Sequence, residues 1–248
     1  MGIHILNCVS MNPWWPRWHI GGVSLLVETD EGPVLVDTGL GLQDYDHPSR
    51  LVRFYIAGTG IAMDSERSAI RQVVRYGWQP EKVRHIVLTH LHFDHAGGLP
   101  DFPQAWVHVY QPEYAALRKP RGLVERLAYN KPAFSHGPKW VFHDEINARW
   151  FDFEAIRLDF KPEIFLIPLP GHTRGHCGVA IRDRSGWLFL CADALPTDVR
   201  FDLLPQWIYK LIIGPHVPRL KAFAGAHPEV RLLAGHMGLD FFEKQVSG

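Results

Sequence analysis

Short runs of apolar and β-branched residues, each bounded by turn-forming residues, recur along most of the chain. Runs of this length with Gly, Pro, Asp or Asn beside them are typical of β-strands. The acidic connection "TDEGP", which contains Gly and Pro, separates the first two runs and predicts a hairpin turn. The pattern predicts strands over Val23–Glu28, Val34–Asp37, Val83–Thr89, Ala105–Tyr110, Phe153–Leu158, Glu163–Leu169, Gly178–Ile181, Trp187–Ala192 and Val230–Ala234.

Apolar residues at helical spacing occur between these runs. The segment "DSERSAIRQVVRYG" at residues 64–77 predicts a helix with an Asp or Ser cap before it and a Gly after it. The segment "QPEYAALR" predicts a second helix with Pro112 in its first turn, and a third is expected near Arg219–Gly225. Residues 119–150 hold several Pro, Gly and aromatic residues, and we interpret them as an irregular insertion with one helix around Leu123–Tyr129.

Strands and amphipathic helices are mixed in both halves of the chain. Such a mixture favours sheets that are covered by helices, which is an α/β layered fold. A chain of 248 residues is long enough to bury a sizeable core, and no linker divides it. We therefore expect residues 1–248 to form a single domain.

Composition and charge exclude several classes of protein. Hydrophobic residues make up 46% and charged residues 21% of the chain, as in an ordinary globular protein. The 26 Lys and Arg residues balance the 26 Asp and Glu residues, and the pI is near 7.3. A chain with this charge balance gives no sign of the basic patch that binds nucleic acid or anionic lipid. We expect neither nucleic acid nor a membrane as a partner.

The cysteines and the first residues bear on the cellular compartment. Cys8, Cys177 and Cys191 are odd in number and widely spaced, unlike the cysteines of a secreted disulfide scaffold. Residues 1–22 have neither the basic segment nor the long apolar segment of a signal peptide. We therefore expect a reduced, cytoplasmic setting, with Cys191 as a small core residue.

A dense group of polar residues follows one of the predicted strands, in the segment "VLTHLHFDHAGG". His90 and His92 face the same way in an extended chain, about 7 Å apart, and a metal ion can bridge this span if the backbone bends. Asp94 and His95 follow directly, and the small residues behind them suit a turn into a helix. Nitrogen and oxygen donors at this density predict a site for zinc or a similar cation.

Two neighbouring ions explain this density better than one. The adjacent Asp94 and His95 cannot easily point at the ion that His90 and His92 would hold, so further ligands are needed. Later strand candidates end in three groups of the right chemistry, at sheet edges where functional groups are often presented. These groups are His172 in "PGHTRGH", Asp193 in "FLCAD" and His236 in "LAGH".

These motifs, in their order along the chain, resemble the metallo-β-lactamase superfamily of binuclear metallohydrolases. The resemblance rests on "VDTG", "HLHFDHAGG", "GHT", "AD" and "GH" and extends roughly from Gly21 to Gly238. It implies an αββα sandwich that carries two Zn²⁺ ions, with iron or manganese as alternative metals. By this resemblance, Asp37 would orient the ligand loop. The implied ligands are His90, His92 and His172 for one ion, Asp94, His95 and His236 for the second, and Asp193 for both.

Within the superfamily, the acyl-homoserine lactonase branch has the most similar string of residues. That resemblance implies a quorum-quenching enzyme that opens a lactone, or cleaves another carboxylic ester, by attack of a metal-bridging hydroxide. Asp94 or Asp193 would carry the proton. The branch usually has a tyrosine three residues after the bridging aspartate, whereas this chain has Pro196 there, which leaves the substrate open. The alternatives are a thioesterase, a β-lactamase-like enzyme, a phosphodiesterase, or an iron oxidoreductase similar to persulfide dioxygenases.

Several residues near these motifs are candidates for supporting roles. Phe93 lies between the expected ligands and is a candidate for contact with a small-molecule ester or lactone. His176 would support the site or serve as a structural histidine. An aromatic group in "NPWWPRW" would line a substrate pocket or pack in the core or in a homodimer. This group consists of Trp14, Trp15 and Trp18.

Overall fold

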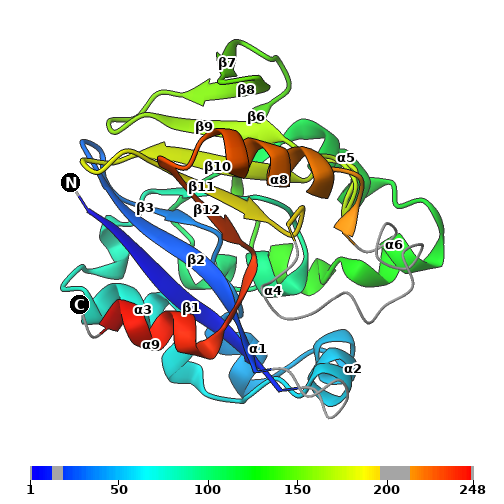
Figure 1. The fold of residues 1–248 in the computed structure, drawn as a ribbon. Helices are drawn as coiled ribbons and strands as arrows, with labels where there is room; N and C mark the ends of the chain where they lie inside the picture. Colours follow the sequence, from blue (N-terminus) through cyan, green and yellow to red (C-terminus); the bar gives the residue numbers. More distant parts are fainter. Residues whose placement is uncertain (1, 13–18, 196–212, 247–248) are drawn as a thin grey trace.

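Two β-sheets packed face to face, with helices on their outer faces, make up the architecture of the computed structural model (Figure 1). The structure describes residues 2–12, 19–195 and 213–246. The layered α/β fold that the sequence predicts is therefore confirmed. In the described part of the chain, every helix is too short or too polar to cross a bilayer.

The first sheet has seven strands in the order β1-β2-β3-β4-β5-β6, and β13 pairs with β2. Strands β1, β2 and β3 are antiparallel, whereas β3, β4, β5 and β6 run parallel to one another. The strands are β1 (Ile3–Met11), β2 (Ile20–Thr29), β3 (Gly32–Val36), β4 (His85–Val87), β5 (Trp106–Tyr110), β6 (Lys139–His143) and β13 (His236–Gly238).

The second sheet has six strands in the order β12-β11-β10-β9-β8-β7. Its pairs are antiparallel except for β11 and β12, which are parallel. The strands are β7 (Ala148–Trp150), β8 (Phe153–Leu158), β9 (Ile164–Pro168), β10 (Cys177–Arg182), β11 (Trp187–Ala192) and β12 (Val230–Ala234).

The helices of the described residues are short, and several are single 3₁₀ turns. The α-helices are α1 (Leu42–Asp46), α2 (Arg50–Thr59), α3 (Ala69–Arg75), α4 (Phe93–Ala96), α5 (Gln111–Arg118), α6 (Gly122–Ala128), α8 (Val217–Ala226) and α9 (Leu239–Val246). The 3₁₀ turns are η1 (Ser65–Arg67), η2 (Pro80–Lys82), η3 (Leu99–Asp101) and η4 (Lys131–Phe134).

Apolar side chains fill the space between the two sheets. Leu25 and Val36 of the first sheet share a buried cluster with Leu166, Val179 and Leu190 of the second. Side chains alternate between the two faces of a strand, so the neighbouring residues of these strands face outward. The apolar side chains on the outer faces are buried by the helices.

Helices cover the outer face of each sheet. On the first sheet, Val73 of α3 and Leu117 of α5 pack in one cluster with Leu35 and Val107. On the second sheet, α8 lies along the strands (Figure 1), and its Phe223 packs against residues such as Phe189. The order helix, sheet, sheet, helix is the αββα arrangement that the sequence motifs imply.

Most predicted elements are present, and the differences have local causes. The predicted strand Val83–Thr89 is reduced to β4, because the backbone N–H of Thr89 donates to Asp37 Oδ1 (2.8 Å) instead of to a neighbouring strand. The predicted helix over residues 64–77 is divided into η1 and α3, because Ser68 between them has an extended ψ of 145°.

Residues 119–150 are more regular than the sequence pattern indicates. They contain the expected helix as α6, but also η4 and two strands, β6 and β7. Strand β6 extends the first sheet beside β5, and β7 pairs with β8. Strand β6 lies at an edge of its sheet, and its residues are exposed or only partly buried, so it lacks the apolar alternation that identifies inner strands.

Candidate metal centre

The loop after β4 and the short helix α4 carry the dense histidine motif. Residues 88–92 leave the strand, and His92 occupies the N-terminal cap position of α4. Helix α4 then places Asp94 and His95 in its single turn. The bend in the backbone that the sequence requires for a shared ion is therefore present.

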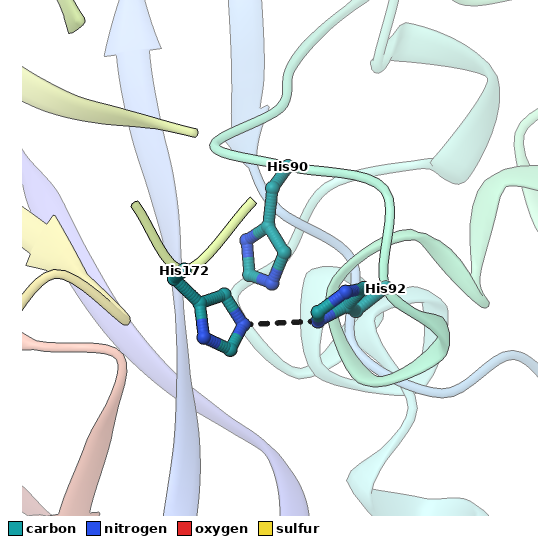
Figure 2. A group of neighbouring side chains, drawn as sticks. All are labelled: His90, His92 and His172. Carbon is teal, nitrogen blue, oxygen red and sulfur yellow. Dashed lines mark hydrogen bonds between the residues drawn. The ribbon is translucent and has the colours of Figure 1, made fainter. Parts of the chain in front are cut away.

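Three histidines from two separate segments form the first cluster. His90 and His92 come from the loop after β4, whereas His172 comes from the connection between β9 and β10. One ring nitrogen of each lies within 4.8 Å of the others. Figure 2 shows the three rings turned toward one another, with His172 Nε2 3.0 Å from His92 Nδ1.

A second cluster lies on the other side of the motif. It contains Asp94 and His95 of α4 and His236, which begins β13. Their donor atoms also lie within 4.8 Å of one another, and His236 Nε2 is 3.5 Å from Asp94 Oδ2. Strand β13 pairs with β2, so the first sheet holds His236 in place.

Asp193 lies between the two clusters and presents one carboxylate oxygen to each. Its Oδ2 atom is 3.3 Å from His172 Nε2 and 3.9 Å from His90 Nε2. Its Oδ1 atom is 3.5 Å from His95 Nε2 and 3.6 Å from His236 Nε2. A carboxylate in this position can contribute one oxygen to each of two cations.

The backbone around Asp193 is shaped to bring this carboxylate inward. Ala192, at the end of β11, has a φ of +46°, a region that residues other than Gly seldom adopt. A Cβ atom on Gly235 would overlap Asp193 Oδ1, so only glycine leaves room at that position. The backbone N–H of Asp193 donates to His176 Nε2 at 3.2 Å. His176 therefore contacts the backbone of Asp193, and whether it supports the site or is a structural histidine stays a prediction.

Asp37 fixes the orientation of the motif. It follows β3 with a φ of +57°, and its Oδ2 atom lies 2.8 Å from His95 Nδ1. The same carboxylate accepts the backbone N–H of Thr89 at 2.8 Å and the Thr89 hydroxyl at 2.7 Å. Thr89 Oγ1 in turn lies 3.0 Å from His90 Nδ1. These contacts leave the Nε2 atoms of His90 and His95 to face the two clusters.

The donor atoms fit divalent cations. Among the described residues, His90 Nε2, His95 Nε2 and Asp193 Oδ1 are buried without a hydrogen-bond partner. Buried polar atoms are rarely left unpartnered, because each costs free energy. A mixture of imidazole and carboxylate donors is a set that Zn²⁺ binds. The residues therefore fit a pair of such cations.

The electrostatic environment differs between the two clusters. Burial, together with neighbouring histidines, holds the pKa of His90 and His92 well below the ordinary value, so both rings are neutral and able to bind a metal. For His95 and His236, burial lowers the pKa, but nearby carboxylates, with Asp193 foremost, raise it overall. A cation at the second cluster would displace protons from these two rings.

Comparison with known proteins identifies the family. The sequence pattern of the "Metallo-beta-lactamase superfamily" matches residues 19–236, which is most of the chain. The chain belongs to the metallo-beta-lactamase superfamily.

Curated relatives in this superfamily include hydrolases and lactonases. A "Probable metallo-hydrolase" of Mycobacterium tuberculosis and one of Mycobacterium bovis are each 41% identical over 77% of this chain. The chain spans 62% of the length of these two relatives. An "N-acyl homoserine lactonase" of Bacillus sp. is 30% identical over 71% of this chain and 65% of its own length. One of Bacillus thuringiensis is 29% identical over 84% and 70%.

Solved structures of other proteins share the fold of this chain. A "probable metal-dependent hydrolase from Staphylococcus aureus" aligns with a TM-score of 0.71 and 17% identity, over 95% of this chain and 89% of that one. A variant of B. thuringiensis AiiA with "N-decanoyl-L-homoserine bound at the active site" aligns with a TM-score of 0.65 and 23% identity, over 98% and 92%. At such identities the likeness concerns the fold alone.

Some of the predicted site residues lie at the metal centre, and others lie elsewhere or outside the described residues. The structure brings the seven expected ligands together in two clusters and in a third group, made of His90, His95 and Asp193, that connects them. Phe93 is only 6% exposed and stacks on Tyr55 of α2, with ring centroids 4.5 Å apart, so its contact with substrate stays a prediction. Cys191 is fully buried in the core, as expected. The sequence candidates outside the described residues are Trp14, Trp15, Trp18 and Pro196.

Glu113 of α5 is a buried residue near the site that the sequence interpretation missed. It accepts hydrogen bonds from residues of two ligand-bearing segments, Leu91 and Thr173. Burial raises the pKa of Glu113, although these hydrogen bonds oppose the shift. A signal was available, because Glu113, Ala116 and Leu117 share the buried face of α5 at helical spacing. A carboxylate on the core-facing stripe of a helix needs a partner.

Proposed function

We propose that the chain is a zinc-dependent hydrolase that opens a lactone or cleaves a carboxylic ester. The single observation that carries this proposal is the position of Asp193, whose two oxygens face two different clusters of donors. Two donor clusters, rather than one, support a binuclear hydrolase over an oxidoreductase with a single iron. Two divalent cations, when bound, would polarise a carbonyl oxygen and lower the pKa of water toward neutrality.

The ligands of each cation are assigned from the clusters. We assign His90, His92 and His172 to one cation, and Asp94, His95 and His236 to the other. The carboxylate of Asp193, whose Oδ2 lies beside His172 and whose Oδ1 lies beside His236, would serve both cations.

Proton transfer would fall to the two carboxylates in the site. The side chains of Asp94 and Asp193 are only 12% and 11% exposed, and both face the donor clusters. Asp94 has His236 beside Oδ2, whereas both oxygens of Asp193 face histidines. Asp94 is therefore freer to accept a proton from water and to return it to the leaving alkoxide.

The lactone or ester class of substrate is supported by the relatives. The N-acyl homoserine lactonases of Bacillus sp. and Bacillus thuringiensis match most of this chain at 30% and 29% identity. Pro196 stands where that branch usually has a tyrosine, so we expect a lactone or ester whose carbonyl does not depend on that phenol.

One experiment tests the metal and the substrate together. Purified protein is analysed for metal per chain and then assayed, loaded with zinc, on lactones, aryl esters, thioesters, β-lactams and phosphodiesters. We expect about two metal ions per chain and turnover of a lactone or ester that a chelator abolishes. Turnover confined to the other three classes would refute the substrate assignment, and protein that binds no divalent metal would refute the hydrolase itself.

A further inference from the structure

Glu113 holds together two segments that are distant in the sequence. Its carboxylate accepts hydrogen bonds from four donors and is fully buried. Oε1 accepts the backbone N–H of Leu91 (3.0 Å) and the hydroxyl of Tyr129 (3.2 Å). Oε2 accepts the hydroxyl of Thr173 (2.6 Å) and the backbone N–H of Gly175 (3.1 Å). All four of these partners donate to the carboxylate.

Each oxygen of this carboxylate contacts a segment that carries a cluster histidine. Leu91 lies between His90 and His92, and Thr173 directly follows His172. His92 Nδ1 and His172 Nε2, which belong to these two segments, are 3.0 Å apart. The carboxylate therefore bridges the two backbones beside this pair of rings.

The approach of α5 to the second segment is unusually close. A Cβ atom on Gly175 would overlap the backbone of Glu113, so the segment can reach the carboxylate only because residue 175 is glycine. The two ligand segments also share a direct backbone hydrogen bond, from Cys177 N to Thr89 O (2.9 Å). This bond would keep the two segments associated when the carboxylate is replaced. Glu113 can therefore be substituted without separating them.

We propose that Glu113 is a positioning residue that holds His92 and His172 at the separation required to bind one cation. The proposal rests on the metal binding of the proposed function. Its effect falls chiefly on the His90, His92 and His172 cluster, because the carboxylate bonds to Leu91, between His90 and His92, and to Thr173, beside His172. None of its four hydrogen bonds reaches a ligand of the second cluster. A residue with a merely structural role would weaken both clusters or neither.

Cobalt binding to single-cluster backgrounds tests this selectivity. His236→Ala leaves the first cluster intact, and His92→Ala leaves the second. Co²⁺ is titrated into each background with and without Glu113→Gln, with affinity measured by equilibrium dialysis and visible absorption. We expect Glu113→Gln to weaken cobalt binding about tenfold in the His236→Ala background and to leave it unchanged in the His92→Ala background.

A matched pair of hydroxyl deletions gives a second, milder test. Thr173→Val and Tyr129→Phe each remove one hydroxyl bonded to Glu113, but only Thr173 belongs to a ligand segment. In the His236→Ala background, we expect Thr173→Val to weaken cobalt binding several-fold and more than Tyr129→Phe does. Val73→Ala, which shortens a buried side chain of α3 and removes no hydrogen bond to Glu113, is the control for a general loss of stability, read as the melting temperature of the metal-free protein.

The outcomes separate the two proposals. If wild-type protein binds cobalt and Glu113→Gln changes the cobalt affinity of neither background, the role of Glu113 alone would be overturned. An equal loss in both backgrounds would do the same, since it indicates a structural role. Wild-type protein that binds no cobalt would overturn the metal site itself and this role with it. If Glu113→Gln does not fold, an equal effect of Thr173→Val and Tyr129→Phe would overturn the proposal.

Discussion

Asp193 Oδ2 lies 3.3 Å from His172 Nε2, while the other oxygen of the same carboxylate faces the second cluster. His172 follows β9 and Asp193 follows β11, so this contact joins the ends of two strands of the second sheet. The motif histidines come from the first sheet. The site is therefore built across the sheet interface, and one carboxylate links its two halves.

Replacing Asp193 by Asn should remove both cations together. The amide keeps the size of the carboxylate but loses its charge and one acceptor oxygen, and each cluster is served by one of those oxygens. We expect metal content to fall at both clusters and turnover to fall at least about 100-fold. Metal analysis and initial rates measure this. Asp159→Asn, which changes an exposed carboxylate directly after β8, is the control, and full activity of Asp193→Asn would contradict the bridging role.

Replacing Asp37 by Asn should affect the second cluster more than the first. The carboxylate of Asp37 accepts from His95 Nδ1 and so keeps Nε2 directed at the cluster. An amide nitrogen at that position would favour the other tautomer of His95. We expect metal affinity at the Asp94, His95 and His236 cluster to fall about 10–100-fold. Cobalt titration checks this, and loss of binding at the first cluster only would contradict it.

Removing the metal should lower thermal stability. Cations that bind only the folded chain stabilise it by RT ln(1 + [L]/Kd), which is about 2.7 kcal/mol at a hundred times Kd. The buried, unpartnered atoms of His90, His95 and Asp193 would then face one another without compensation. We expect a chelator to lower the melting temperature and added zinc to restore it. Scanning calorimetry measures this, and Asp193→Asn should show a smaller response.

Most residues of the site could be predicted from the sequence, because they lie in short local motifs. Donors placed every second residue, followed by small residues, predict a cation site without knowledge of the fold, and strand ends then indicate His172 and Asp193. The inner strands were equally readable, and β11 agrees with its prediction to the residue. Short-range patterns determine these features.

Features that depend on tertiary contacts were harder to predict. Strand β1 has polar residues such as His4 and Asn7 among its apolar ones, and its pairing with β2 decides its structure. Strand β6 is held by β5 at a sheet edge. Glu113 forms hydrogen bonds with residues that are 22 and 60 positions away in the sequence. The residues next to Glu113 in the sequence do not indicate these partners.

A chain of three histidines lies across adjacent strands of the first sheet, apart from the metal centre. His108 of β5 lies between His85 of β4 and His143 of β6, with nitrogen separations of 3.0 Å on each side. Burial, then the neighbouring charges of His143 and His85, lowers the pKa of His108 to about 3. The ring is therefore neutral in the folded protein over a wide range of pH.

Acid should destabilise the protein through His108. In the unfolded chain its pKa is about 6.5, so between about pH 3 and pH 6.5 the unfolded state binds a proton that the folded state does not. The contribution is fully present above pH 6.5 and is lost as the pH falls, by about 1.4 kcal/mol per unit. His108→Gln keeps polar atoms for both neighbours but cannot titrate, so its free energy of unfolding should fall less steeply between pH 6 and pH 4. Urea unfolding of both proteins, freed of metal, measures the two slopes, and equal slopes would contradict the assignment of this acid sensitivity to His108.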